Sequence, residues 1–103
     1  MNIKIQSIKF DADKKLTDFI EKKVNKIERY FDNIVDVEVF LRIQNSQELD
    51  NKVAEIRIKV PGSDLFAQRQ SKSFEEAIDD CVDAIVNGFL KDIKIKYAGF
   101  NNH

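Results

Sequence analysis

The chain is poor in residues that mark many enzymes and extracellular proteins. It has one cysteine, Cys81, and one histidine, His103, which is the last residue. A single cysteine excludes an internal disulfide, and no motif marks a nucleophile with its base. The three glycines, at positions 62, 88 and 99, are not spaced as a phosphate-binding loop. We therefore expect no enzymatic activity, no cofactor and no small-molecule substrate.

Long hydrophobic runs are also missing. No apolar stretch approaches the length of about 20 residues that a membrane-spanning helix needs, and the first residues lack the basic region and apolar core of a signal peptide. We expect a cytoplasmic protein with no membrane partner. The 103 residues, 43% hydrophobic and 34% charged, indicate one globular domain. Because the net charge is only -1, any affinity for nucleic acid must come from charge that is separated locally.

The hydrophobic patterns predict six elements in the order βαβββα. Strands are predicted at 2–9, 34–44, 54–60 and 64–71, and helices from 14 to about 31 and from 74 to about 94 or 96. Asp13 is predicted to cap the first helix, Ser73 with Glu76 the second, and Pro61 with Gly62 suits a type II turn. In the second strand, alternation predicts five inward residues: Val35, Val37, Val39, Leu41 and Ile43.

One apolar stripe on each helix and one apolar face on each strand predict the packing. The expected fold is α+β, a four-stranded mixed sheet with two helices packed side by side on one face. Cys81 falls on the apolar face of the second helix and is expected to be a buried structural thiol. On the other sheet face, Phe40, Val53 and Phe66 either stack RNA bases, contact a protein or are scattered surface residues, and we favour the last interpretation.

Charge in the two helices is sorted by sign. In the first helix, Lys15, Lys22, Lys26 and Arg29 lie on one flank, Lys23 emerges at the edge of the apolar stripe, and Glu21 and Glu28 lie on the other flank. This arrangement indicates a surface for a polyanion, and ordinary solvated charge is the alternative. The acids of the second helix, at positions 75, 76, 79, 80 and 83, suit its N-terminal dipole better than a metal site.

Two segments carry a resemblance to a known family. The spacing K-x-x-K-I-E-x-Y-F-D, from Lys23 to Asp32, resembles the ribosome hibernation-promoting factors, also called ribosome-associated translation inhibitors. Ala67, Phe74 and the run 77–79 match the family's A-x-x-x-x-x-D-M-Y-x-A-I-D segment at the same spacing. The resemblance covers residues 2 to about 96.

The resemblance implies a non-enzymatic translation inhibitor that acts during stress or in stationary phase. Such proteins bind the decoding region of the small ribosomal subunit, in the channel for mRNA and tRNA, and stabilise idle, hibernating ribosomes. Residues 1–98 would then be one ribosome-binding domain, with 99–103 as a short flexible tail. The expected rRNA contacts are Lys15, Lys22, Lys23, Lys26, Arg29, Lys91 and Lys94. If their role is electrostatic, we expect Lys22, Lys23, Lys26 and Arg29 to be largely exposed.

The second helix departs from the family. Six acids oppose one base between Ser73 and Asp92, whereas family members usually carry several bases in the middle of this helix. The alternative hypothesis is therefore a protein-interaction module of the same fold that does not bind RNA. Weak homo-oligomerisation and the effect on ribosome dimers are left open by the sequence.

Overall fold

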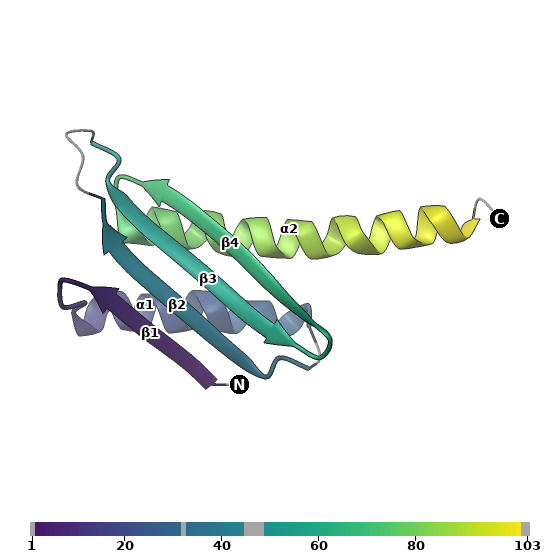
Figure 1. Cartoon of the computed structure of the whole chain (residues 1–103), viewed down its shortest axis with the longest axis horizontal. Coiled ribbons are helices and arrows are strands. Elements are labelled where there is room, and N and C mark those ends of the chain that lie inside the picture. Colours follow the sequence, from purple (N-terminus) through teal and green to yellow (C-terminus); the bar gives the residue numbers. More distant parts are fainter. Residues whose placement is uncertain (1, 32, 45–48, 102–103) are drawn as a thin grey trace.

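Two helices cover one face of a four-stranded sheet in the computed structural model of the chain (Figure 1). The structure describes residues 2–31, 33–44 and 49–101, and side chains as far as residue 88. The strands are β1 (Asn2–Ile8), β2 (Asp36–Ile43), β3 (Lys52–Val60) and β4 (Ser63–Ser71). The helices are α1 (Lys14–Asn25), continued by the 3-10 helix η1 (Lys26–Arg29), and α2 (Phe74–Asn101). The predicted α+β class and βαβββα order are confirmed.

The sheet has the strand order β1-β2-β3-β4. β1 pairs with β2 in parallel, while β2 with β3 and β3 with β4 are antiparallel, so the sheet is mixed as predicted. A two-residue connection, Pro61 and Gly62, joins β3 to β4 and places Val60 opposite Ser63. Gly62 has a φ of 80°, the left-handed conformation that the second central position of a type II turn requires.

Both predicted helix caps are present. The Asp13 carboxylate accepts a hydrogen bond from the backbone N–H of Leu16 at 2.8 Å, and the Ser73 hydroxyl accepts one from the N–H of Glu76 at 3.1 Å. Each cap satisfies a donor that the first helical turn leaves without an intrahelical partner. The two helices therefore begin where the sequence indicates, and both begin at the same end of the molecule (Figure 1).

The core lies between the sheet and the helices. Its fully buried residues come from α1, η1, the three strands after the first helix and α2, and include Ile20, Val24, Ile27, Val37, Val39, Leu41, Ile56, Ile58, Ile78 and Cys81. The Cys81 thiol lies 3.3 Å from the carbonyl oxygen of Ala54, and burial raises the pKa of this thiol to about 11. Cys81 is thus a buried structural thiol, as predicted.

Three apolar residues depart from the predicted pattern. Val35 is 50% exposed and Ile43 is 48% exposed, although alternation predicted that both point into the core. Alternation predicts the face on which a side chain lies but not how deeply it is buried. Val35 immediately precedes β2, and Ile43 is its last residue. Val53 belongs to the open sheet face yet is only 1% exposed. It lies on a central strand, paired with Arg42 and Gln70 on the strands to either side.

The ends of both helices also differ from expectation. The first helix is α-helical only to Asn25 and tightens into η1, which ends at Arg29, before the predicted end near Phe31. The second continues to Asn101, beyond the predicted end near Lys94 or Lys96, and Gly99 lies inside it. Figure 1 shows its C-terminal part extending past the sheet. A flexible tail over 99–103 stays a prediction.

Candidate nucleic-acid interface

Three cations at the C-terminal end of the first helix form what we call the basic flank: Lys22, Lys26 and Arg29. All three are exposed, because the opposite side of the same segment is held in the core by Ile20 and Val24. In a 3-10 helix, side chains three residues apart are eclipsed. The tightening into η1 therefore brings Lys26 and Arg29, its first and last residues, onto one line.

The basic flank is a concentration of like charge. The charge of Lys23, followed by those of Lys22 and Arg29, lowers the pKa of Lys26 below its ordinary value. Among the described residues, none of the three flank cations forms an ion pair within 4.0 Å. Mutual repulsion without a neutralising acid is the electrostatic condition under which an external anion binds favourably. Lys22, Lys26 and Arg29 therefore meet the expectation of an exposed cationic surface.

Lys23 does not behave as predicted. Its side chain is only 25% exposed, and its amino group lies 3.0 Å from a carboxylate oxygen of Asp79 on α2. The amino group also lies 5.5 Å from the centroid of the Phe19 ring. The hydrogen bond to Asp79 and the charge of Asp79 raise the pKa of Lys23, and Asp83 adds to this. The expectation that Lys23 is largely exposed is wrong, since this cation joins the two helices.

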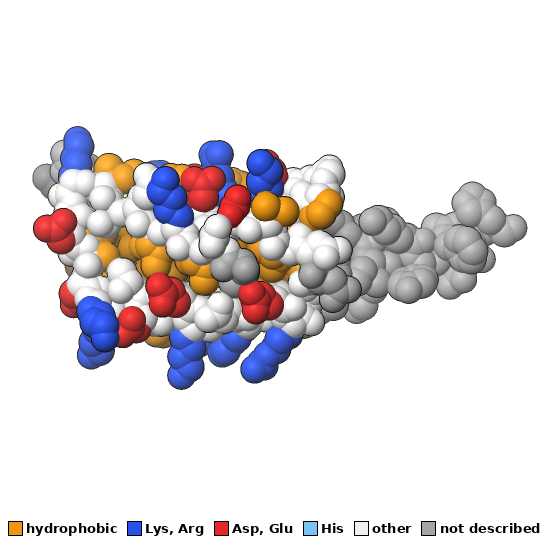
Figure 2. Space-filling view, turned by 90° about the horizontal axis from the view of Figure 1, so that it is seen from below, with side chains coloured by type: hydrophobic (Ala, Val, Ile, Leu, Met, Phe, Trp, Pro, Cys, Tyr) orange, Lys and Arg blue, Asp and Glu red, His pale blue; other side chains and the backbone are white. Residues whose placement is uncertain are grey.

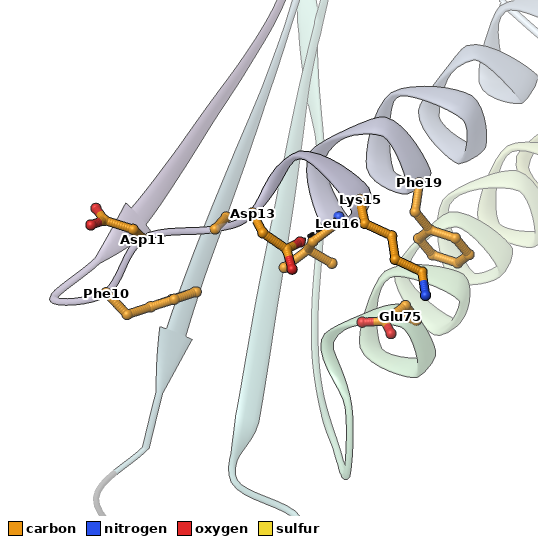
Figure 3. Close-up of a pocket in the computed structure, with 8 residues that line it drawn as sticks. Phe10, Asp11, Asp13, Lys15, Leu16, Phe19 and Glu75 are labelled. Atoms are coloured by element: carbon orange, nitrogen blue, oxygen red, sulfur yellow. Dashed lines mark hydrogen bonds between the residues drawn. The ribbon is translucent and has the colours of Figure 1, made fainter.

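Lys15 is separate from the basic flank. It lies at the rim of a cavity of about 470 Å³, where the loop before α1 and the first turns of both helices meet. Figure 3 shows the Lys15 amino group pointing toward Glu75, over a floor that includes Leu16 and Phe19. With Asp13 and Glu75 also present, this cavity has mixed charge and does not extend the basic flank. Lys91 and Lys94 lie outside the residues whose side chains are described.

The open face of the sheet carries a stack that the sequence analysis missed. The Arg57 guanidinium lies 5.4 Å from the ring centroid of Phe66 and 6.0 Å from that of Phe40. Its Nε also contacts the Glu55 carboxylate at 3.2 Å. The signal was present in the sequence, because a two-residue turn at Pro61 and Gly62 fixes a register in which Arg57 is opposite Phe66. Phe40 and Phe66 are therefore parts of one cluster.

Cationic side chains occur on more than one side of the molecule. Figure 2 shows Lys and Arg side chains projecting from both long margins of the described body, with hydrophobic side chains visible in a band between them. On the open sheet face, however, the cations are interleaved with acids: Arg57 pairs across the strands with Glu38, and Lys59 with Asp36 and Asp64. The basic flank differs in that none of its three cations forms an ion pair with a described acid.

Two other kinds of site are absent from the described part of the chain. Residues 2–31, 33–44 and 49–88 contain no group of three or more His, Cys, Asp or Glu side chains placed to hold a metal ion. None of the described helices is both long enough and apolar enough to span a membrane. The acids of α2 instead lie in its first turns, where the helix dipole favours them.

Comparison with known sequences identifies similar proteins. The family described as "Sigma 54 modulation protein / S30EA ribosomal protein" matches residues 3–91. The ribosome hibernation promoting factor of Azotobacter vinelandii is 28% identical over 91 residues, which is 88% of this chain and 81% of that protein. The ribosome hibernation promotion factor of Bacillus subtilis is 28% identical over 94 residues. That match spans 91% of this chain and 47% of the Bacillus protein.

Solved structures share the fold. The Thermus thermophilus Protein Y N-terminal domain is 26% identical, with a TM-score of 0.74 over 86% of this chain and 96% of that domain. A ribosomal subunit interface protein from Coxiella burnetii is 23% identical, with a TM-score of 0.79 over 91% of this chain and 99% of that protein. The arrangement of four strands and two helices is therefore found in other proteins.

Proposed function

The chain belongs to the sigma 54 modulation protein / S30EA ribosomal protein family, and on that premise we propose that it is a ribosome hibernation factor. It binds the small ribosomal subunit through rRNA at the decoding region and stabilises idle ribosomes in the cytoplasm. The proposal requires no reaction and no cofactor, because occupying the channel for mRNA and tRNA is sufficient to inhibit translation. Relatives named as ribosome hibernation factors support the ribosome as the partner.

The observation that carries the proposal is the basic flank. Lys22, Lys26 and Arg29 are exposed side by side, and the pKa of Lys26 is lowered chiefly by the charge of Lys23, with smaller contributions from Lys22 and Arg29. RNA phosphates supply the missing negative charge, and each Lys or Arg contact adds affinity and fixes orientation without reading base sequence. Selectivity for the ribosome would then come from the shape of the channel.

Charge reversal on the basic flank tests the proposal. The double variant Lys22→Glu, Lys26→Glu is expected to bind purified small subunits at least about tenfold more weakly, a loss of roughly 1.4 kcal/mol in binding free energy. The reason is that two attractions to phosphate become repulsions. Binding is measured by sedimentation of the subunits with labelled protein over a range of salt concentrations, and the wild-type affinity is expected to fall steeply with added salt.

A matched control uses the acids of the same helix. Glu21→Lys with Glu28→Lys changes two charges on the opposite flank and is expected not to weaken binding. Circular dichroism and thermal unfolding show whether each double variant is folded. The proposal is wrong if both folded double variants bind small subunits equally well, or if the wild-type protein stays at the top of the gradient at low salt.

The cluster on the open sheet face favours a second candidate function, that of a protein-interaction module. Phe66 is 54% exposed beside Arg57, and the surrounding charges are mixed. An apolar contact of this kind keeps its affinity when salt is added, whereas phosphate contacts do not. A salt-insensitive interaction that is lost in Phe66→Ser and retained in the Lys22→Glu, Lys26→Glu variant would assign the function to this face.

A further inference from the structure

Asp79 forms an ion pair with a cation that lies next to the basic flank. Lys23 lies beside Lys22 and Lys26, yet its amino group lies 3.0 Å from the Asp79 carboxylate on the neighbouring helix. We propose that Asp79 is a specificity-determining residue. It occupies Lys23 in place of phosphate and so weakens the binding of any RNA whose shape does not match. This inference rests on the proposed function and concerns the same surface.

The geometry allows the contact to be exchanged for a phosphate. The Asp79 side chain is 46% exposed and that of Lys23 is 25% exposed, so the pair lies at the surface and not in the core. Surface ion pairs are weak because water solvates both partners and salt screens their attraction. A phosphate that approaches the basic flank can therefore displace Asp79, but the displaced carboxylate remains nearby and repels it.

This repulsion distinguishes one RNA from another. A flexible RNA strand binds through loose contacts to several cations, and it gains little from Lys23 because Asp79 already neutralises that charge. A rigid groove of fixed shape can place one phosphate on Lys23 while it leaves space for Asp79 to turn toward water. Asp79 therefore lowers the affinity for non-specific RNA more than the affinity for the correct site.

Two further observations separate Lys23 from its neighbours. Its ammonium group lies over the ring of Phe19, four residues earlier in α1, at 5.5 Å from the centroid. Asp83, one helical turn after Asp79, adds to the negative potential at Lys23. Lys22, Lys26 and Arg29 have no such ion pair among the described residues, so Asp79 acts on one cation of the group.

The test compares Asp79→Asn with the wild-type protein on two probes, a single-stranded polyuridine RNA and purified small ribosomal subunits. Asp79→Asn is expected to bind polyuridine about threefold more tightly, within the range of one surface ion pair. The plot of log affinity against log salt is expected to steepen by about 0.7, the value for one additional phosphate contact on a single strand. The gain on small subunits is expected to be smaller.

Matched variants assign the effect to the pair. Asp64→Asn makes the same change of charge on β4, at an exposed position, and is expected to leave the salt slope unchanged. Asp79→Glu keeps the charge and is expected to bind as the wild type does. In a Lys23→Gln background, Asp79→Asn is expected to add nothing. Thermal unfolding confirms that each variant is folded.

The inference is overturned if Asp79→Asn and Asp64→Asn behave alike, if the gain persists without Lys23, or if the gain on small subunits is the larger one. It fails independently of the proposed function. If the wild-type protein binds small subunits and Asp79→Asn changes neither affinity nor salt slope, the proposed function holds and only the role of Asp79 is refuted. Wild-type protein that does not bind small subunits removes the function, and with it the role of Asp79 in ribosome selectivity, whatever polyuridine shows.

Discussion

The two helices cover the same face of the sheet but are opposite in charge. The first, from Lys14 to Arg29, has six basic and three acidic residues, while residues 74–88 of α2 have five acidic residues and no basic one. Both bury an apolar stripe against the same sheet face, and the two begin at the same end of the molecule (Figure 1). The cations of the basic flank lie in the last turn of α1 and in η1, and the acids of α2 lie near its N-terminal end.

The helix dipole favours both distributions, so stability alone accounts for part of the contrast. It does not account for what happens where the helices meet. There Lys23 forms an ion pair with Asp79, whereas none of the cations of the basic flank forms one among the described residues. The contrast shows that position relative to the neighbouring helix, more than residue type, decides which cations are available to a polyanion.

The largest expected effect tests whether the helices are equally anchored despite their opposite charges. Ile20 on α1 and Ile78 on α2 are both fully buried. Ile20→Ala and Ile78→Ala are each expected to lower the free energy of unfolding by about 2–5 kcal/mol, because each removes apolar contacts and leaves a cavity. Urea unfolding followed by circular dichroism measures this.

The exposed residue Asn25 supplies the control, since Asn25→Ala is expected to change stability by no more than about 0.5 kcal/mol. A loss below about 1 kcal/mol at either isoleucine would show that the corresponding helix is not packed on the sheet as described. Equal losses would show that apolar burial, and not the sign of the surface charge, holds both helices in place.

The packing of both helices on the sheet was predictable from the sequence, but the contact between them was not. Local signals sufficed for the caps at Asp13 and Ser73, the turn at Gly62 and the apolar stripes, since each depends on residues close in the chain. The ion pair of Lys23 with Asp79 depends on how far one helix is shifted along the other. That shift is set by packing across the whole core, and no local pattern encodes it.

A similar limit applies to strands and helix ends. Alternation correctly assigned Val37, Val39 and Leu41 to the core but not Ile43, because burial depends on what covers the face as well as on its direction. Val53 is the converse case, an open-face residue on a central strand that is nearly fully buried. Exposure was therefore predicted correctly for the cations of the basic flank and incorrectly for Lys23, which contacts the neighbouring helix. Their contact with rRNA stays a prediction.

A smaller effect is expected where the helices meet. Lys23→Glu places a carboxylate beside Asp79 and Asp83, so repulsion replaces attraction and the melting temperature is expected to fall. Lys22→Glu makes the same substitution one residue earlier, on the exposed side, and is expected to leave the melting temperature nearly unchanged. Differential scanning calorimetry at low salt measures both, and added salt is expected to reduce the difference. Equal melting temperatures at low salt would contradict the ion pair.

The smallest effect concerns the order in which the lysines lose their protons. The hydrogen bond and charge of Asp79 raise the pKa of Lys23, whereas the charge of Lys23 lowers that of Lys26. As pH rises, Lys26 is therefore expected to titrate before Lys23, and NMR of the lysine Cε carbons can follow each separately. Because the folded pKa of Lys23 is raised above the ordinary value of 10.5, its contribution to stability is present below that pH and is lost as pH rises through the folded value. In Asp79→Asn the midpoint of Lys23 is expected to fall below its wild-type value. Midpoints of Lys23 and Lys26 that coincide in the wild type would show that the neighbouring helix does not distinguish the two cations.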